Sequence, residues 1–154
     1  MQTYTGNTPL FTACANKYKN IVEYLIEQRA DTYKENKYGE TPLHIACLYG
    51  KENNLKKLIE HDANVNKKDK YGETPIYTAC RNGYKNIVKI LIEYGANINN
   101  NNVKGETPLF SAYKKWKDRI SKKYLVEQRE TINIINKNGN SIINISRIQK
   151  YFYI

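Results

Sequence analysis

Apolar residues in this chain fall into short clusters that come in pairs, separated by polar stretches. The first cluster of a pair follows a Thr-Pro dipeptide directly, as Leu43, Ile45 and Ala46 do. The second cluster places its apolar residues three and four positions apart, which is the spacing of an amphipathic helix. Examples of the second cluster are Leu55, Leu58 and Ile59, and later Ile87, Val88, Leu91 and Ile92. Each pair of clusters therefore predicts a short helix followed by a longer one.

Polar and special residues set the expected helix boundaries. Thr41 can accept a hydrogen bond from the first turn, and Pro42 suits the first helical position, so the short helix should begin there. It should end near Gly50, since glycine readily takes the left-handed conformation that closes a helix. The longer helix is expected from about Asn53 to Glu60, with Asn53 as its N-cap and Asn20 and Asn86 in the matching places.

The segment after each longer helix is polar and rich in turn-forming residues. In one copy it runs through Ala63-Asn64-Val65-Asn66 to Lys70-Tyr71-Gly72, with Val65 as its one apolar anchor. This composition favours an extended, hairpin-like loop.

The unit of loop, short helix, turn and longer helix recurs every thirty-three residues. A Gly-x-Thr-Pro motif begins at Gly6, Gly39, Gly72 and Gly105. A degenerate copy without proline begins at Gly139, thirty-four residues after the last of these. A fixed period of this length predicts a stack of repeats. We expect one array over residues 1–154, with units at about 5–37, 38–70, 71–103 and 104–137 and a degenerate half-unit at 138–154.

These repeats resemble the ankyrin family from about Thr5 to about Arg147. The Gly-x-Thr-Pro-Leu-His-x-Ala core is nearly intact from Gly39 to Ala46, and the Gly-Ala-Asn-Ile-Asn tail stands at Gly95 to Asn99. The resemblance implies an all-α ankyrin-repeat solenoid of stacked helix-turn-helix units with projecting β-hairpin-like loops. It also implies that His44 forms local hydrogen bonds that steady its loop.

Several positions depart from the repeat. Glycine is replaced by Lys17 and Trp116 at the end of the short helix, and by Arg29 and Asp62 at the end of the longer one. Each replacement should cost about 1 kcal/mol where a left-handed residue is needed. The fourth unit carries one extra residue around 120–124, which should bulge or shift its second helix. The fifth unit should keep only a first helix, from about Ser141 to Tyr153.

Composition indicates the kind of partner and the compartment. The formal net charge of +10 favours acidic partners, although Lys, Asn, Ile and Tyr are abundant together, as biased nucleotide composition would also produce. No apolar run is long enough to span a bilayer, so we expect no membrane insertion. Three cysteines at equivalent repeat positions are too far apart to bridge, which suits a reducing, intracellular and cytoplasmic setting. A nuclear location or one inside a host cell fits the same observations.

The resemblance places a partner on the concave face, at the loop tips and the exposed side of the short helices. By register the loop-tip candidates are Lys37, Tyr38, Lys70, Tyr71 and Lys104, and the short-helix candidates are Tyr49, Arg81, Lys114 and Lys115. Tyrosine and arginine are typical interface anchors. We therefore expect a scaffold, adaptor or inhibitor that binds an unidentified protein, and the basic net charge favours an acidic one.

Two alternatives remain open at this stage. Seven basic residues between Val103 and Lys123 make binding of nucleic acid or another polyanion through the C-terminal half the second hypothesis, although the family resemblance disfavours nucleic acid. We expect a monomer. The apolar end Tyr151-Phe152-Tyr153-Ile154 either folds back, supports end-to-end association, or marks a chain cut from a longer array.

The sequence offers little catalytic chemistry. His44 and His61 stand apart, and the cysteines form no Cys-x-x-Cys motif, so we expect no metal site and no cofactor. Cys14, Cys47 and Cys80 occupy the place of a small packing residue. Glu40, Glu73 and Glu106 belong to separate units and are interpreted as loop-tip surface. We expect the protein not to be an enzyme.

Overall fold

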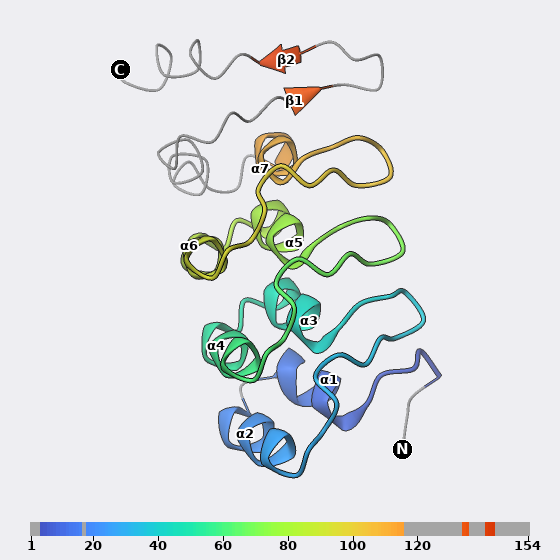
Figure 1. Cartoon of the computed structure of the whole chain (residues 1–154), viewed down its shortest axis with the longest axis vertical. Coiled ribbons are helices and arrows are strands. Elements are labelled where there is room, and N and C mark those ends of the chain that lie inside the picture. The colour runs from blue at the N-terminus through green and yellow to red at the C-terminus, as the bar shows by residue number, and fades with distance from the viewer. Residues whose placement is uncertain (1–3, 17, 116–133, 136–140, 144–154) are drawn as a thin grey trace.

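The computed structural model describes residues 4–16, 18–115, 134–135 and 141–143, without the side chains of Lys19, of residues 113–115 or of the last two segments. Three pairs of antiparallel helices and a seventh helix stack along one axis (Figure 1). The helices are α1 (Pro9–Ala15), α2 (Lys19–Glu27), α3 (Pro42–Leu48), α4 (Glu52–Glu60), α5 (Pro75–Asn82), α6 (Lys85–Glu93) and α7 (Pro108–Lys115). The predicted helical solenoid is confirmed.

The stack has three layers, which Figure 1 shows side by side. The short helices α1, α3, α5 and α7 pack on one another in one column, and the longer helices α2, α4 and α6 form a second column. Hairpin-like loops project from the short-helix column on the side away from the longer helices. We refer below to the short helices as inner and to the longer ones as outer.

The Thr-Pro pairs start the inner helices as predicted. Thr41 and His44 form a capping box at α3, in which the His44 ring nitrogen Nδ1 accepts from the Thr41 backbone N–H at 3.1 Å. Thr74 accepts from the backbone N–H of Tyr77 at 3.4 Å at the start of α5. These contacts satisfy N–H groups at the helix starts that would otherwise lack a partner.

The predicted N-caps of the outer helices were wrong by two residues. Asn20, Asn53 and Asn86 lie inside the first turn, and the cap positions belong to Tyr18, Lys51 and Tyr84. The Tyr18 carbonyl already accepts from the backbone N–H groups of Ile21 and Val22, so the helix has begun before Asn20. The Asn86 side chain instead reaches the previous repeat and donates to Glu52 Oε1 at 2.9 Å.

The first two repeats have Arg29 and Asp62 in the left-handed region at the position where the third repeat has glycine. The φ angles of Arg29 and Asp62 are 59° and 64°, and that of Gly95 is 80°. The strained glycine-like positions predicted for Arg29 and Asp62 are therefore confirmed. The corresponding expectations for Lys17 and Trp116 concern residues outside those described.

The core runs along the junction of the two helix columns. Leu10, Leu43, Ile76 and Leu109 recur at one inner-helix position and are at most 3% exposed. Cys14, Cys47 and Cys80 are buried in the same column, as their predicted packing role requires, and burial raises the pKa of Cys14 to about 12. This repetition means that each unit is braced by its neighbours rather than by one central core.

Two short strands follow the last described helix. β1 (Ile134–Ile135) pairs antiparallel with β2 (Ser141–Ile143). The expectation of a helix starting at Ser141 is therefore wrong at residues 141–143, where Ile142 and Ile143 are β-branched residues that favour a strand and no proline starts a helix. The predicted insertion at 120–124, the remainder of that helix and the apolar end at 151–154 lie outside the described residues.

Candidate functional site

Three successive hairpin loops are each built around one side chain that accepts two backbone hydrogen bonds. Asn36 Oδ1 accepts from the N–H groups of Tyr38 and Glu40 at 2.9 and 3.0 Å. Asp69 and Asn102 do the same in the next two loops, with distances of 2.8 to 3.0 Å. This turn fixes the backbone of the loop tip before any partner is present.

The tips are also joined to one another. The backbone N–H of Lys70 donates to the carbonyl of Tyr38 at 3.0 Å, and that of Val103 donates to Tyr71 at 2.8 Å. Gly39 makes this close approach possible, because a Cβ atom there would lie 2.9 Å from the Lys70 nitrogen. The loop tips therefore form one continuous, hydrogen-bonded edge along the array.

The tip residues predicted from the sequence lie on this edge with their side chains in solvent. Tyr38 and Tyr71 are 46% and 55% exposed, and Lys37, Lys70 and Lys104 are exposed as well. The Lys37 ammonium also lies 4.0 Å from the centre of the Tyr4 ring, a favourable cation–π distance. Tyr4 is 91% exposed and extends the row by one repeat.

The inner-helix candidates are placed less uniformly. Tyr49 follows α3 directly and is 52% exposed. Arg81, near the end of α5, is half-buried and forms an ion pair with Glu73 at the base of the same repeat's loop. Lys114 and Lys115 lie at the end of α7, and their side chains are outside the described part of the chain.

The three loop glutamates were interpreted from the sequence as loop-tip surface. In the structure each of them makes a contact within the protein. The Glu40 carboxylate accepts from Asn36 Nδ2 at 2.7 Å, Glu73 pairs with Arg81, and Glu106 accepts from the Tyr77 hydroxyl at 2.9 Å. Burial raises the pKa of Glu73, against the opposing effect of the Arg81 charge. These acids therefore hold the loops internally, while the lysines of the tips point into solvent.

His44 in α3 and Tyr77 in α5 each connect their inner helix to the loop of the following repeat. His44 Nδ1 accepts from Thr41, so Nε2 carries the proton and donates to the Glu73 carbonyl of the next repeat at 3.2 Å. Tyr77, at the same position one repeat later, donates to Glu106 and accepts from Asn102 Nδ2 at 3.0 Å. Burial lowers the pKa of His44, so the ring is neutral at physiological pH. The structural role expected for His44 is confirmed.

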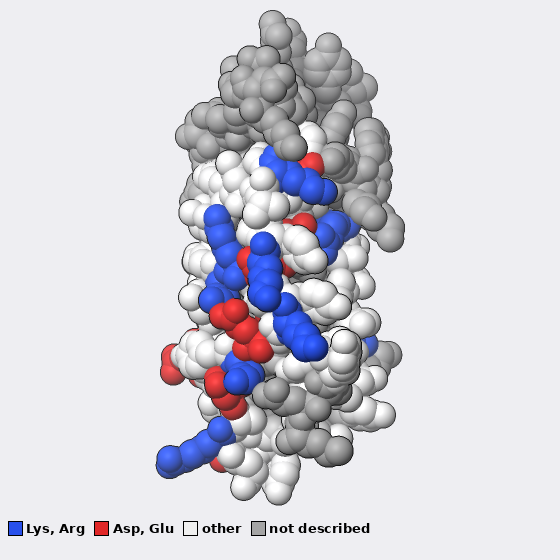
Figure 2. Space-filling view, turned by 90° about the vertical axis from the view of Figure 1, so that its right-hand side faces the viewer, with Lys and Arg blue, Asp and Glu red and all other residues white. Residues whose placement is uncertain are grey.

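Figure 2 looks onto the hairpin side and shows how charge is distributed along it. Lysine and arginine side chains extend along the length of this side, and acidic side chains lie between them mainly in the lower, N-terminal half. Lys70 and Lys104, which lie in the loops of this side, are exposed. The arrangement is suited to attract a partner of negative charge.

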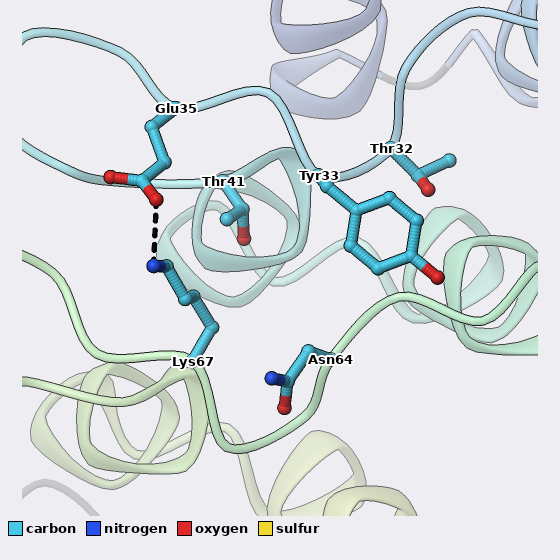
Figure 3. A pocket seen from close by; sticks show the side chains of 6 residues that line it. All are labelled: Thr32, Tyr33, Glu35, Thr41, Asn64 and Lys67. Carbon is cyan, nitrogen blue, oxygen red and sulfur yellow. Dashed lines mark ion pairs between the residues drawn. The ribbon is translucent and has the colours of Figure 1, made fainter.

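A shallow pocket of about 260 Å³ lies between the hairpins and is shown in Figure 3. It is lined by Thr32, Tyr33, Glu35, Thr41, Asn64 and Lys67. Glu35 and Lys67 pair across it at 2.6 Å, and the Tyr33 hydroxyl donates to the Asp62 carbonyl at 2.9 Å. These contacts connect neighbouring repeats, so we assign the pocket a structural role.

The described residues offer neither a metal site nor a membrane-spanning helix. Within them, no three His, Cys, Asp or Glu side chains gather closely enough to hold a metal ion. In the same part of the chain, every helix is too short or too polar to cross a bilayer.

The sequence missed the residues that organise the loops. Asn36, Asp69 and Asn102 stand three positions before the loop glycines in three successive units, and this recurrence was the available signal. The partners of the glutamates could not be found in this way, because Glu73 uses Arg81 while Glu106 uses Tyr77.

The loop edge and the stacked helix pairs define a solenoid of the class that presents an extended recognition surface. Comparison with protein-family models agrees: residues 1–69 match a model of ankyrin repeats in three copies, and residues 58–109 match a second model of ankyrin repeats in many copies. The chain belongs to the ankyrin-repeat family. Ankyrin repeats generally mediate protein–protein interaction. No curated protein matches this chain.

Proposed function

We propose that this protein is a non-catalytic interaction module that binds another protein through the loop tips and the exposed ends of the inner helices. The observation that carries the proposal is the hydrogen-bonded loop edge, which presents Tyr38 and Tyr71 half-exposed on a fixed backbone. Tyrosines held in this way can bury a large area at a low entropic cost. Tyr49 and Arg81 extend the surface onto the inner helices.

The charges of this surface favour an acidic partner. Glu40, Glu73 and Glu106 are used in internal contacts, while Lys37, Lys70 and Lys104 remain in solvent. Exposed lysines at the rim of an interface mainly accelerate association and make it sensitive to salt. Arg81 differs from them, since its ion pair with Glu73 orients it before binding.

Affinity capture from a cell lysate tests the proposed face. The test variant carries alanine at Tyr38, Tyr49 and Tyr71, and the control carries alanine at Lys56, Lys85 and Tyr94, which are exposed on or beside the outer helices. The same protein should be captured by the wild type and the control and lost with the test variant. Capture of that protein by all three would contradict our choice of face.

Binding of a nucleic acid is the second candidate, because Lys37 and Lys70 directly precede the exposed Tyr38 and Tyr71. Bases can stack on aromatic side chains beside a basic groove. A gel-shift assay with single-stranded RNA and DNA over a salt series separates the two functions. Tight binding that weakens steeply with salt would support the polyanion function, and weak binding at every salt concentration supports a protein partner.

A further inference from the structure

The loop glutamate of the second repeat differs from that of the third in what holds its carboxylate. In the third repeat Glu73 forms an ion pair with the Arg81 guanidinium. In the second repeat the residue in the place of Arg81 is Leu48, which carries no charge. Glu40 accepts from the neutral amide of Asn36 at 2.7 Å, and it forms no ion pair with any residue that the structure describes.

The third repeat shows that these two places lie next to each other in the folded array. Glu73 stands at the base of its hairpin loop, and Arg81 stands eight positions later near the end of α5. Glu40 and Leu48 are also eight positions apart, at the base of the preceding loop and at the last residue of α3. Because α3 and α5 stack on each other and both begin at a Thr-Pro pair, a positive charge over Leu48 lies beside the Glu40 carboxylate.

The Glu40 carboxylate is oriented before any partner binds. Asn36 Nδ2 donates to Glu40 Oε2, and the Glu40 backbone N–H donates to Asn36 Oδ1 at 3.0 Å. The second carboxylate oxygen, Oε1, accepts no hydrogen bond from the described part of the chain. Both oxygens of a carboxylate can accept charge-assisted hydrogen bonds, so Oε1 suits a cationic donor from another molecule.

The residues beside Glu40 favour the flat guanidinium group of an arginine. Leu48 is partly buried and offers apolar surface, and Tyr49, the next residue, is 52% exposed. Arginine packs its planar group on aromatic faces and is less strongly hydrated than lysine. The third repeat already combines such contacts, since Arg81 pairs with a carboxylate and its guanidinium lies 5.8 Å from the centre of the Tyr77 ring.

We propose that Glu40, Leu48 and Tyr49 form a subsite for one arginine side chain of the protein partner. The incoming guanidinium takes the place that Arg81 occupies in the next repeat and pairs with Glu40 Oε1. The subsite rests on the proposed function, because it lies on the same face and serves the same partner. The tip lysines attract acidic groups while Glu40 accepts one basic group, and this alternation of charge fixes the register of the partner along the loop edge.

Titration of the full chain with N-acetyl-arginine amide, followed by NMR of the backbone amides, tests the subsite without the partner. The control probe is N-acetyl-citrulline amide, which has nearly the same shape and no charge. The arginine probe should cause saturable shifts at Glu40, Leu48 and Tyr49, and the citrulline probe should bind at least about fivefold more weakly. Equal binding of the two probes, or no saturable shift at these residues, would overturn the subsite.

Exchange of residues between the repeats supplies matched variants. Leu48→Arg places an internal guanidinium beside Glu40 and should abolish the shifts in the second repeat. Glu40→Gln removes the charge with little change of shape and should weaken binding of the arginine probe at least about fivefold. Arg81→Leu frees the Glu73 carboxylate and should create a second set of shifts at the base of the third loop. The amide spectra also report whether each variant is folded, and a folded Leu48→Arg variant that binds the probe like the wild type would exclude the subsite.

Capture of the partner separates failure of the subsite from failure of the proposed face. Leu48→Arg should reduce capture of the partner at least about fivefold. A partner that is lost with the variant carrying alanine at Tyr38, Tyr49 and Tyr71 but is fully captured by Leu48→Arg would keep the proposed face and overturn the arginine subsite. A partner that binds all these variants would contradict the face, and the probe titration then decides on the subsite by itself.

Discussion

At the scale of single residues, the left-handed positions show where the repeat is under local strain. Asp62 and Gly95 occupy equivalent places with φ angles of 64° and 80°. A residue with a Cβ atom pays for this conformation with about 1–2 kcal/mol, which asparagine and aspartate partly avoid, and glycine has no such cost. The two positions therefore give a matched pair of opposite substitutions.

Asp62→Gly should raise the free energy of unfolding by about 0.5 kcal/mol, since relief of backbone strain exceeds the extra entropy of glycine in the unfolded chain. Gly95→Ala should lower it by about 1 kcal/mol, because the added methyl group meets open space and only the backbone is strained. Urea denaturation measures both. If both substitutions changed the free energy of unfolding in the same direction, this explanation of the helix ends would be wrong.

His44 should make stability depend on pH. Burial lowers its pKa below the ordinary 6.5, so between these two values the unfolded chain binds a proton that the folded chain does not. The stabilisation from the neutral ring is complete above pH 6.5 and is lost as the pH falls below it, with a slope of at most about 1.4 kcal/mol per pH unit.

His44→Phe, which introduces the residue found at the equivalent Phe11 and Phe110, should remove this part of the pH dependence. Urea denaturation at pH 7.5 and at pH 5.5 compares the two proteins. If the variant loses as much stability as the wild type between these pH values, His44 is not the source of the pH dependence.

At the scale of elements, the hairpin loops depend on one side chain each. Asn36 accepts from two backbone N–H groups, and its Nδ2 donates to Asn7 Oδ1 at 3.1 Å and to Glu40 Oε2 at 2.7 Å. Asn36→Ala should therefore lower the free energy of unfolding by about 1–3 kcal/mol, because buried loop groups lose their partners.

Asn36→Asp is the matched comparison, since Asp69 performs the same turn in the next loop. It keeps the acceptor for both N–H groups but places a carboxylate beside Glu40, so its loss of stability should be smaller than that of the alanine variant. Chemical denaturation of both variants measures the difference. A loss for Asn36→Ala no larger than that for Asn36→Asp would show that the two backbone contacts contribute little.

The helices and their contacts show which structural features could be predicted from the sequence and which could not. The helix pairs were predictable because Thr-Pro starts and three-to-four spacing are local signals that recur. The starts of the outer helices were not, since Asn20 and Asn53 are good caps in isolation while the carbonyls of Tyr18 and Lys51 begin the helix earlier. Contacts between repeats, such as Asn54 with the end of α1, depend on stacking and leave no periodic trace.

For the candidate site, the sequence predicted positions better than interactions. Register alone placed Tyr38, Tyr71 and the tip lysines in solvent on one edge. It did not reveal that Glu73 would be held by Arg81, because these two residues are eight positions apart and the position equivalent to Arg81 in the second repeat is Leu48, which carries no charge. Long-range pairing of this kind follows from the packed structure alone.

At the scale of the whole molecule, the exposed lysines should act on the rate of association. Replacing Lys37, Lys70 and Lys104 by glutamine should slow association with an acidic protein partner by about tenfold at low salt and reduce the dependence on ionic strength. The dissociation rate should change little. Surface plasmon resonance with the captured partner measures both rates, and a change confined to dissociation would contradict a steering role.

The proposed function requires a protein partner that covers the loop edge and leaves the outer helices free. Lysine acetylation of the isolated protein and of its complex with the captured partner, followed by mass spectrometry, tests this directly. We predict that Lys37, Lys70 and Lys104 become protected in the complex, while Lys56, Lys85 and Lys89 of the outer helices react as before. Protection of the outer-helix lysines with unchanged reactivity at the loop tips would contradict the account.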